Sequence, residues 1–181
     1  MKYTDFFLDF INDVKKNKFT NVDALKEPII NQMTIDEHSQ VHAALCYLGH
    51  NEDEQSNAWY SNTLILIYPG KLDKNMDIEY YREMSIWFDL DDIETISQFV
   101  DMFRVYNKPL INSIEVKTSH EYGDGFVCFM GNHASDIVEL GFEAQSIRGK
   151  KYEFNSFQLN KDKFMEFIDD ANILTGTLSV F

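Results

Sequence analysis

The spacing of apolar residues is helical in three separate parts of the chain. Apolar side chains recur every three or four residues near the N-terminus, after residue 90 and after residue 160, as on the buried face of a helix. We therefore predict helices over about 3–17, 91–106 and 160–172. Asp89 and Asn160 precede the last two, where their side chains are suited to cap free N–H groups of the first turn.

A further helix is predicted over about 34–49. Thr34 and Glu37 stand three residues apart, as in a capping box, and Gly49 is suited to end the helix. Before it, Pro28 is expected to end a short helix that begins near Asn21.

The pattern changes to that of β-strands after residue 57. Residues 59–68 end in the apolar run 64–68, which Pro69 and Gly70 close, so a central strand covered on both faces is expected. Further strands are predicted at 80–88, in hairpins at 111–119 with 125–130 and 142–148 with 151–159, and at an edge, 177–181. Because short turns join most strands, we predict an α+β fold, a mainly antiparallel sheet with helices packed on one side.

Length and composition favour one domain over residues 1–181, with a helical N-terminal part (1–50) and a sheet-containing part (57–181). No apolar run approaches the roughly 20 residues that span a bilayer. The N-terminus lacks a secretory signal, and two cysteines, Cys46 and Cys128, do not make a disulfide framework. We therefore expect a cytoplasmic protein in which both thiols are inert core groups.

Two groups of residues suggest metal chemistry, and each also has a structural interpretation. On the predicted helix 34–49, His38 and His42 lie four residues apart and are placed to share a metal ion, which would suit a small metal-dependent enzyme. However, no glutamate stands where a zinc protease needs its general base, so we favour packing beside the apolar stripe.

The second group comprises Asp89, Asp91, Asp92 and Glu94. These carboxylates are suited to surround a magnesium ion, but at a helix start they also cap N–H groups and complement the helix dipole. We favour the structural role. Because no catalytic motif is present, we expect no enzymatic activity, no cofactor and no bound metal.

The most informative feature is charge. Thirty Asp and Glu against 16 Lys and Arg give a net charge of −14, and residues 27–70, 83–103 and 118–147 contain no Lys or Arg. This charge argues against direct binding to nucleic acid or an anionic membrane, and favours a basic protein partner. The predicted contacts are the densest acidic clusters, Glu52, Asp53 and Glu54 together with Asp89, Asp91, Asp92 and Glu94.

The chain also has 16 Ile and 14 Asn but three Arg, a composition typical of AT-rich bacterial or phage genomes. This small, acidic, aromatic-rich chain resembles anti-CRISPR and antirestriction proteins of mobile elements. The segment Ser85–Leu90, followed by an acidic helix, is similar to the strand-to-helix step of antirestriction DNA mimics. Proteins of this class share no fold, so the resemblance assigns no residue roles. It implies a non-enzymatic inhibitor of a nuclease or nuclease–guide complex; the alternative is an immunity protein that neutralises a bacterial toxin.

Overall fold

A computed structural model of the chain describes residues 3–20, 29–47, 63–72, 86–105, 113–116, 125–129, 137–145 and 152–178. Within these residues the protein has helices and two four-stranded antiparallel sheets. The α+β class and the mainly antiparallel pairing predicted from the sequence are therefore confirmed, although the strands form two sheets.

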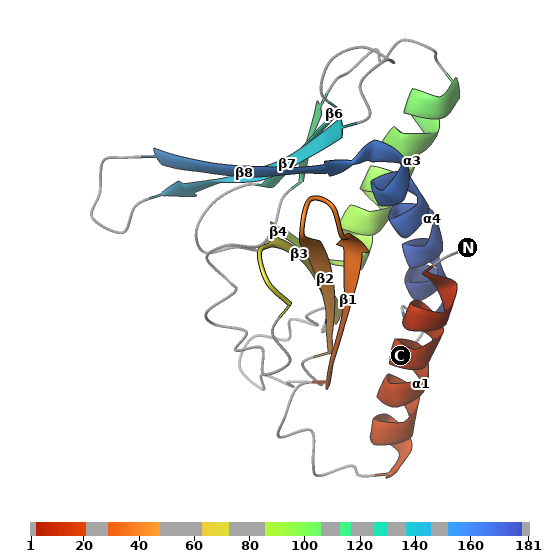
Figure 1. The fold of residues 1–181 in the computed structure, drawn as a ribbon. Helices are drawn as coiled ribbons and strands as arrows, with labels where there is room; N and C mark the ends of the chain where they lie inside the picture. Colours follow the sequence, from red (N-terminus) through yellow and green to blue (C-terminus); the bar gives the residue numbers. More distant parts are fainter. Residues whose placement is uncertain are drawn as a thin grey trace, which may run out of the picture.

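Both sheets follow the order of the sequence, so each strand pairs with its neighbours along the chain (Figure 1). The first sheet contains β1 (Ile29–Asp36), β2 (Val41–Tyr47), β3 (Thr63–Pro69) and β4 (Ile86–Phe88). The second sheet contains β5 (Ser113–Val116), β6 (Gly125–Phe129), β7 (Ile137–Gln145) and β8 (Tyr152–Asn160).

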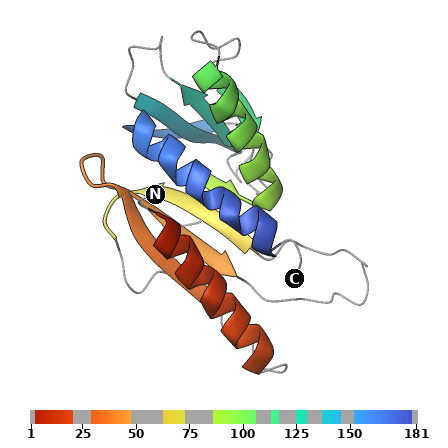
Figure 2. The same cartoon turned by 90° about the vertical axis from the view of Figure 1, so that its right-hand side faces the viewer.

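Three predicted helices are present as α1 (Thr4–Thr20), α3 (Leu90–Val105) and α4 (Lys161–Leu178). Helix α4 contacts α1 and α3, and Figure 2 shows these three helices side by side. Asn160 caps α4 as predicted, because its Oδ1 accepts a hydrogen bond from Lys163 N at 3.0 Å. Helix α4 continues through residues 177 and 178, so the predicted edge strand is wrong there; residues 179–181 lie outside the described part.

The predicted helix at 34–49 is wrong. Residues 34–36 end β1, the polar residues 37–40 form an exposed turn, and β2 follows. The capping-box spacing was misleading because it indicates only a possible helix start and says nothing about burial. Every residue of β2 is buried, as in a strand that is covered on both faces of its sheet. The four polar residues at 37–40 also interrupt the apolar stripe that a helix would need. Strand β1 was missed entirely, and the predicted helix near Asn21 lies outside the described residues.

Strand β3 confirms the prediction of a central strand covered on both faces. It pairs with β2 on one side and β4 on the other. Ile65 and Ile67 join the main core, whereas Leu64, Leu66 and Tyr68 join a smaller buried cluster on the opposite face. Because β2 pairs with β1 on one side and β3 on the other, the first sheet combines strands from the predicted N-terminal part (1–50) and from the predicted sheet-containing part (57–181).

Both predicted hairpins form. Strand β5 pairs with β6, and β7 pairs with β8 over their full length from Ile137 opposite Asn160 to Gln145 opposite Tyr152. The strand expected at 80–88 is present at 86–88, and its earlier residues lie outside the described part.

The main core unites the helices with both sheets. Phe7 and Phe10 of α1, Phe167 of α4 and Val138 of β7 are all fully buried in one cluster. The Phe167 ring lies 5.6 Å from the Tyr3 ring and 5.2 Å from the Phe7 ring, between centroids. These aromatic contacts fix α1 against α4 and thereby set which side of each helix faces solvent.

Candidate functional site

The sides of the three helices that face away from the core carry carboxylates. We call the following exposed residues the acidic helix surface: Asp5 and Asp9 of α1, Asp91 and Glu94 of α3, and Asp162 and Glu166 of α4. Because the helices lie side by side (Figure 2), their exposed faces form one layer of the molecule. The apolar periodicity of each helix places these carboxylates there by turning its other side to the core.

The spacing of the carboxylates repeats from helix to helix. Each pair stands three or four residues apart, which puts the two Cβ atoms about 5–6 Å apart. None of the six side chains makes an ion pair within the described residues. Like charges at this spacing repel one another, so each pair produces a local negative field that a cationic group would relieve.

Arg104 of α3, one of the basic residues in this helix layer, is already paired. Its guanidinium donates to both carboxylate oxygens of Asp169, at 2.9 and 2.6 Å, and lies 3.5 Å from Asp101. The hydrogen bond to Asp169 raises the pKa of Arg104, and the nearby carboxylates add to this shift. This ion pair joins α3 to α4, and the carboxylates of Asp169 and Asp101 neutralise the charge of Arg104.

The predicted cluster at the start of α3 divides into two roles. Asp89 and Asp92 form a reciprocal cap: Asp92 N donates to Asp89 Oδ1 at 2.8 Å, and Asp89 N donates to Asp92 Oδ2 at 3.0 Å. Burial, followed by the neighbouring carboxylates, raises the pKa of Asp92 to about 7. The predicted capping role is thereby confirmed, whereas the side chains of Asp91 and Glu94 are exposed.

The other predicted contacts, Glu52, Asp53 and Glu54, lie outside the described residues. Within the described residues no three His, Cys, Asp or Glu side chains are grouped to hold a metal ion.

The proposed pairing of His38 and His42 depended on a helix that does not form. His38 lies in the exposed turn and His42 on the buried strand β2. Thr34 Oγ1 lies 3.0 Å from His42 Nδ1, and the Gly70 carbonyl accepts from Nε2 at 2.7 Å. Both ring nitrogens therefore have protein partners, and the packing interpretation holds for His42. Cys46 is also buried, and burial raises the pKa of its thiol to about 12, as expected of an inert core group.

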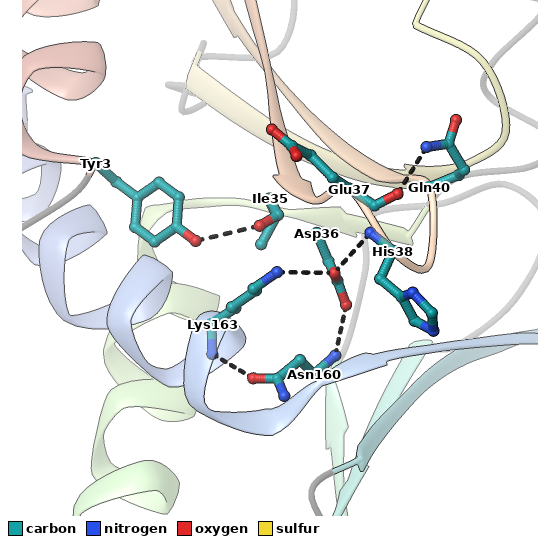
Figure 3. Close-up of polar contacts among 8 residues, drawn as sticks. All are labelled: Tyr3, Ile35, Asp36, Glu37, His38, Gln40, Asn160 and Lys163. Atoms are coloured by element: carbon teal, nitrogen blue, oxygen red, sulfur yellow. Dashed lines mark hydrogen bonds and ion pairs between the residues drawn. The ribbon is translucent and has the colours of Figure 1, made fainter.

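A buried carboxylate that sequence analysis missed joins the end of β1 to the end of β8 and the start of α4. Asp36, only 2% exposed, accepts hydrogen bonds from His38 N at 3.1 Å, Asn160 N at 2.9 Å and Lys163 Nζ at 3.0 Å (Figure 3). Burial alone would raise the pKa of Asp36, but the hydrogen bonds and the Lys163 charge outweigh it and hold the pKa below its ordinary value.

No local sequence pattern predicts these contacts, because Asn160 and Lys163 lie 124 and 127 residues from Asp36 along the chain. The one sequence signal is an aspartate at the end of an apolar strand, where burial requires a partner.

No protein-family model matches the chain, and no curated protein matches it. A solved structure described as "Structure of a guideRNA-binding protein complex bound to a gRNA" has 9% sequence identity to it and a TM-score of 0.41. The match covers 88% of this chain and 99% of that chain. A likeness at this level assigns neither a family nor a function. None of the described helices has the length and apolar character needed to cross a membrane.

Proposed function

We propose that the protein is a non-enzymatic inhibitor that binds a nucleic-acid-handling enzyme of bacterial defence and blocks it. The partner would be a basic protein, a nuclease or a nuclease–guide complex, of the kind that anti-CRISPR and antirestriction proteins inhibit. The acidic helix surface is the observation that supports this proposal, because six exposed carboxylates lie there without ion-pair partners among the described residues.

The physical basis is competition for a cationic groove. Duplex DNA presents one negative charge per about 1.7 Å of its axis, and proteins that bind it line their grooves with Lys and Arg. Rows of carboxylates about 5–6 Å apart on neighbouring helices offer such a groove a comparable ligand. A net charge of −14 would also draw a basic partner from a distance and speed the encounter at low salt.

Inhibition of purified enzymes tests the proposal. The protein would be titrated into CRISPR effector–guide complexes and restriction enzymes while they cleave a plasmid. We expect cleavage by the true target to stop near one equivalent of inhibitor, and the inhibition to weaken steeply between low salt and about 0.5 M salt, as screening shortens the field. Inhibition that persists at high salt would point to apolar contacts and contradict the electrostatic basis.

Matched variants locate the contact. Asp162→Asn with Glu166→Gln removes two charges from the acidic helix surface, whereas Glu37→Gln with Glu139→Gln removes two charges outside the helices. Both double variants have the same net charge. We expect the first to slow association several-fold more than the second. Equal effects would mean that overall charge matters and that the helix surface is not the contact.

A further inference from the structure

Lys163 is a partly exposed cation of α4 that the fold pairs with a buried carboxylate and not with the acidic helix surface. It lies in the first turn of α4, directly after Asp162 and three residues before Glu166. On a helix, residues three apart are neighbours, so a free lysine here would pair with Glu166. In the structure its Nζ instead lies 3.0 Å from Asp36 Oδ1, on the side where α4 meets β1 (Figure 3).

The hold on Lys163 is firm because Asp36 is itself fixed. The carboxylate is buried at the end of β1, and its two oxygens also accept the backbone N–H groups of His38 and Asn160. A buried carboxylate that loses its cation remains charged in a poorly solvated site, so exchanging Lys163 for a surface partner is unfavourable. By contrast, Arg104 is held by Asp101 and Asp169, which are themselves exposed side chains of the helix layer.

We propose that Asp36 is a positioning residue for partner binding: by holding Lys163 inward, it preserves the negative charge of α4 for a basic partner. This inference rests on the proposed function of the acidic helix surface. Replacing Asp36 would release a positive charge among the carboxylates of α4, where it would pair with Glu166 and weaken the attraction for an incoming cationic protein.

A double-mutant cycle on the association rate separates this role from an effect of net charge. The variants are Asp36→Asn, Lys163→Met and the two together, and the probe is a ten-residue polylysine peptide at low salt. We expect Asp36→Asn to slow association about two- to threefold when Lys163 is present and hardly at all when residue 163 is Met. An equal slowing in both backgrounds would be a net-charge effect and would overturn the inference.

The same probe distinguishes failure of the inference from failure of the proposed function. If neutralising Asp162 and Glu166 leaves association unchanged, the acidic helix surface does not bind cations and the proposed function fails. If that variant slows association but the cycle is additive, the positioning role of Asp36 alone is overturned.

A measurement on the unmodified protein covers the case in which Asp36→Asn does not fold. Acetylation of lysine amines, followed by mass spectrometry, would compare Lys163 with Lys71, an exposed lysine. A lysine held by a buried carboxylate should react several-fold more slowly. Equal reactivity would show that Asp36 does not hold Lys163, and the inference would be wrong.

Discussion

Asp36→Asn should lower the free energy of unfolding far more than the same substitution at an exposed aspartate that accepts equally good hydrogen bonds. An asparagine side chain keeps one acceptor but turns a donor toward a group that is itself a donor, Asn160 N or Lys163 Nζ. It also leaves the ammonium of Lys163 without its counter-charge. Breaking a buried ion pair by removing one partner costs about 3–5 kcal/mol. Because the Lys163 side chain is 36% exposed and can turn toward water, we expect about 2–4 kcal/mol.

Asp169→Asn is the matched control. Asp169 also receives two hydrogen bonds from a cation, Arg104, but its side chain is 40% exposed. Surface ion pairs contribute about 0–1 kcal/mol. Urea unfolding at pH 7 would give both values from the shift in midpoint at constant slope. If the two variants lost similar stability, burial would not be what makes Asp36 important, and the reasoning would be refuted.

The pH dependence of the same variant provides a second check. The pKa of Asp36 is lowered in the folded protein, so its stabilisation is present above the unfolded-state pKa of about 4 and is lost as pH falls through the folded-state value. The stability difference between wild type and Asp36→Asn should therefore be full at pH 7 and shrink below pH 4. A difference that stays constant to pH 2.5 would exclude an ionised carboxylate as the cause.

Three further predictions concern other parts of the molecule. Phe10→Asp should prevent folding, since it buries an unpaired charge in the main core. Leu8→Asp, on the exposed side of α1, should change the melting temperature by a few degrees at most. Similar melting temperatures for the two variants would show that α1 does not pack into the core. Because the pKa of Asp92 is raised to about 7, the folded state binds a proton that the unfolded state releases, so its contribution to stability should rise as pH falls from 8 toward 4; Asp92→Asn should remove that rise, and an unchanged pH profile would contradict the assignment. Replacing Glu52, Asp53 and Glu54 by Lys should leave the melt nearly unchanged and slow partner association; unchanged kinetics would show that this acidic segment is merely solvated.

Local patterns predicted the elements whose determinants are local. The helices α1, α3 and α4 follow from apolar spacing within one segment, and the caps at Asp89 and Asn160 lie within three residues of the groups they bind. The hairpin of β1 and β2 was missed because its stability comes from covering both faces of β2, a property of the folded sheet that the local capping signal contradicted.

The candidate site was predictable in charge but not in position. The density of acidic residues along the sequence led us to predict Asp89 and Asp92 as partner contacts, but their side chains cap α3. The exposed Asp5, Asp162 and Glu166 come from opposite ends of the chain, and they share a surface because α1 packs on α4. That packing depends on Tyr3, Phe7 and Phe167, so only the tertiary fold assembles the surface.

The contacts of α4 also set the order in which the newly made protein can become stable. Tyr3 N donates to Asp170 Oδ2 at 2.9 Å, Phe167 packs on the first turns of α1, and Lys163 completes the site of Asp36. A ribosome makes α1 and the first sheet long before α4, at about 5–20 residues per second. During synthesis α1 can pack on β1 but not yet on α4, and Asp36 lacks the hydrogen bonds from Asn160 and Lys163. Final folding begins only when α4 has left the ribosome, so a chain truncated before residue 161 should be a substrate for chaperones and proteases.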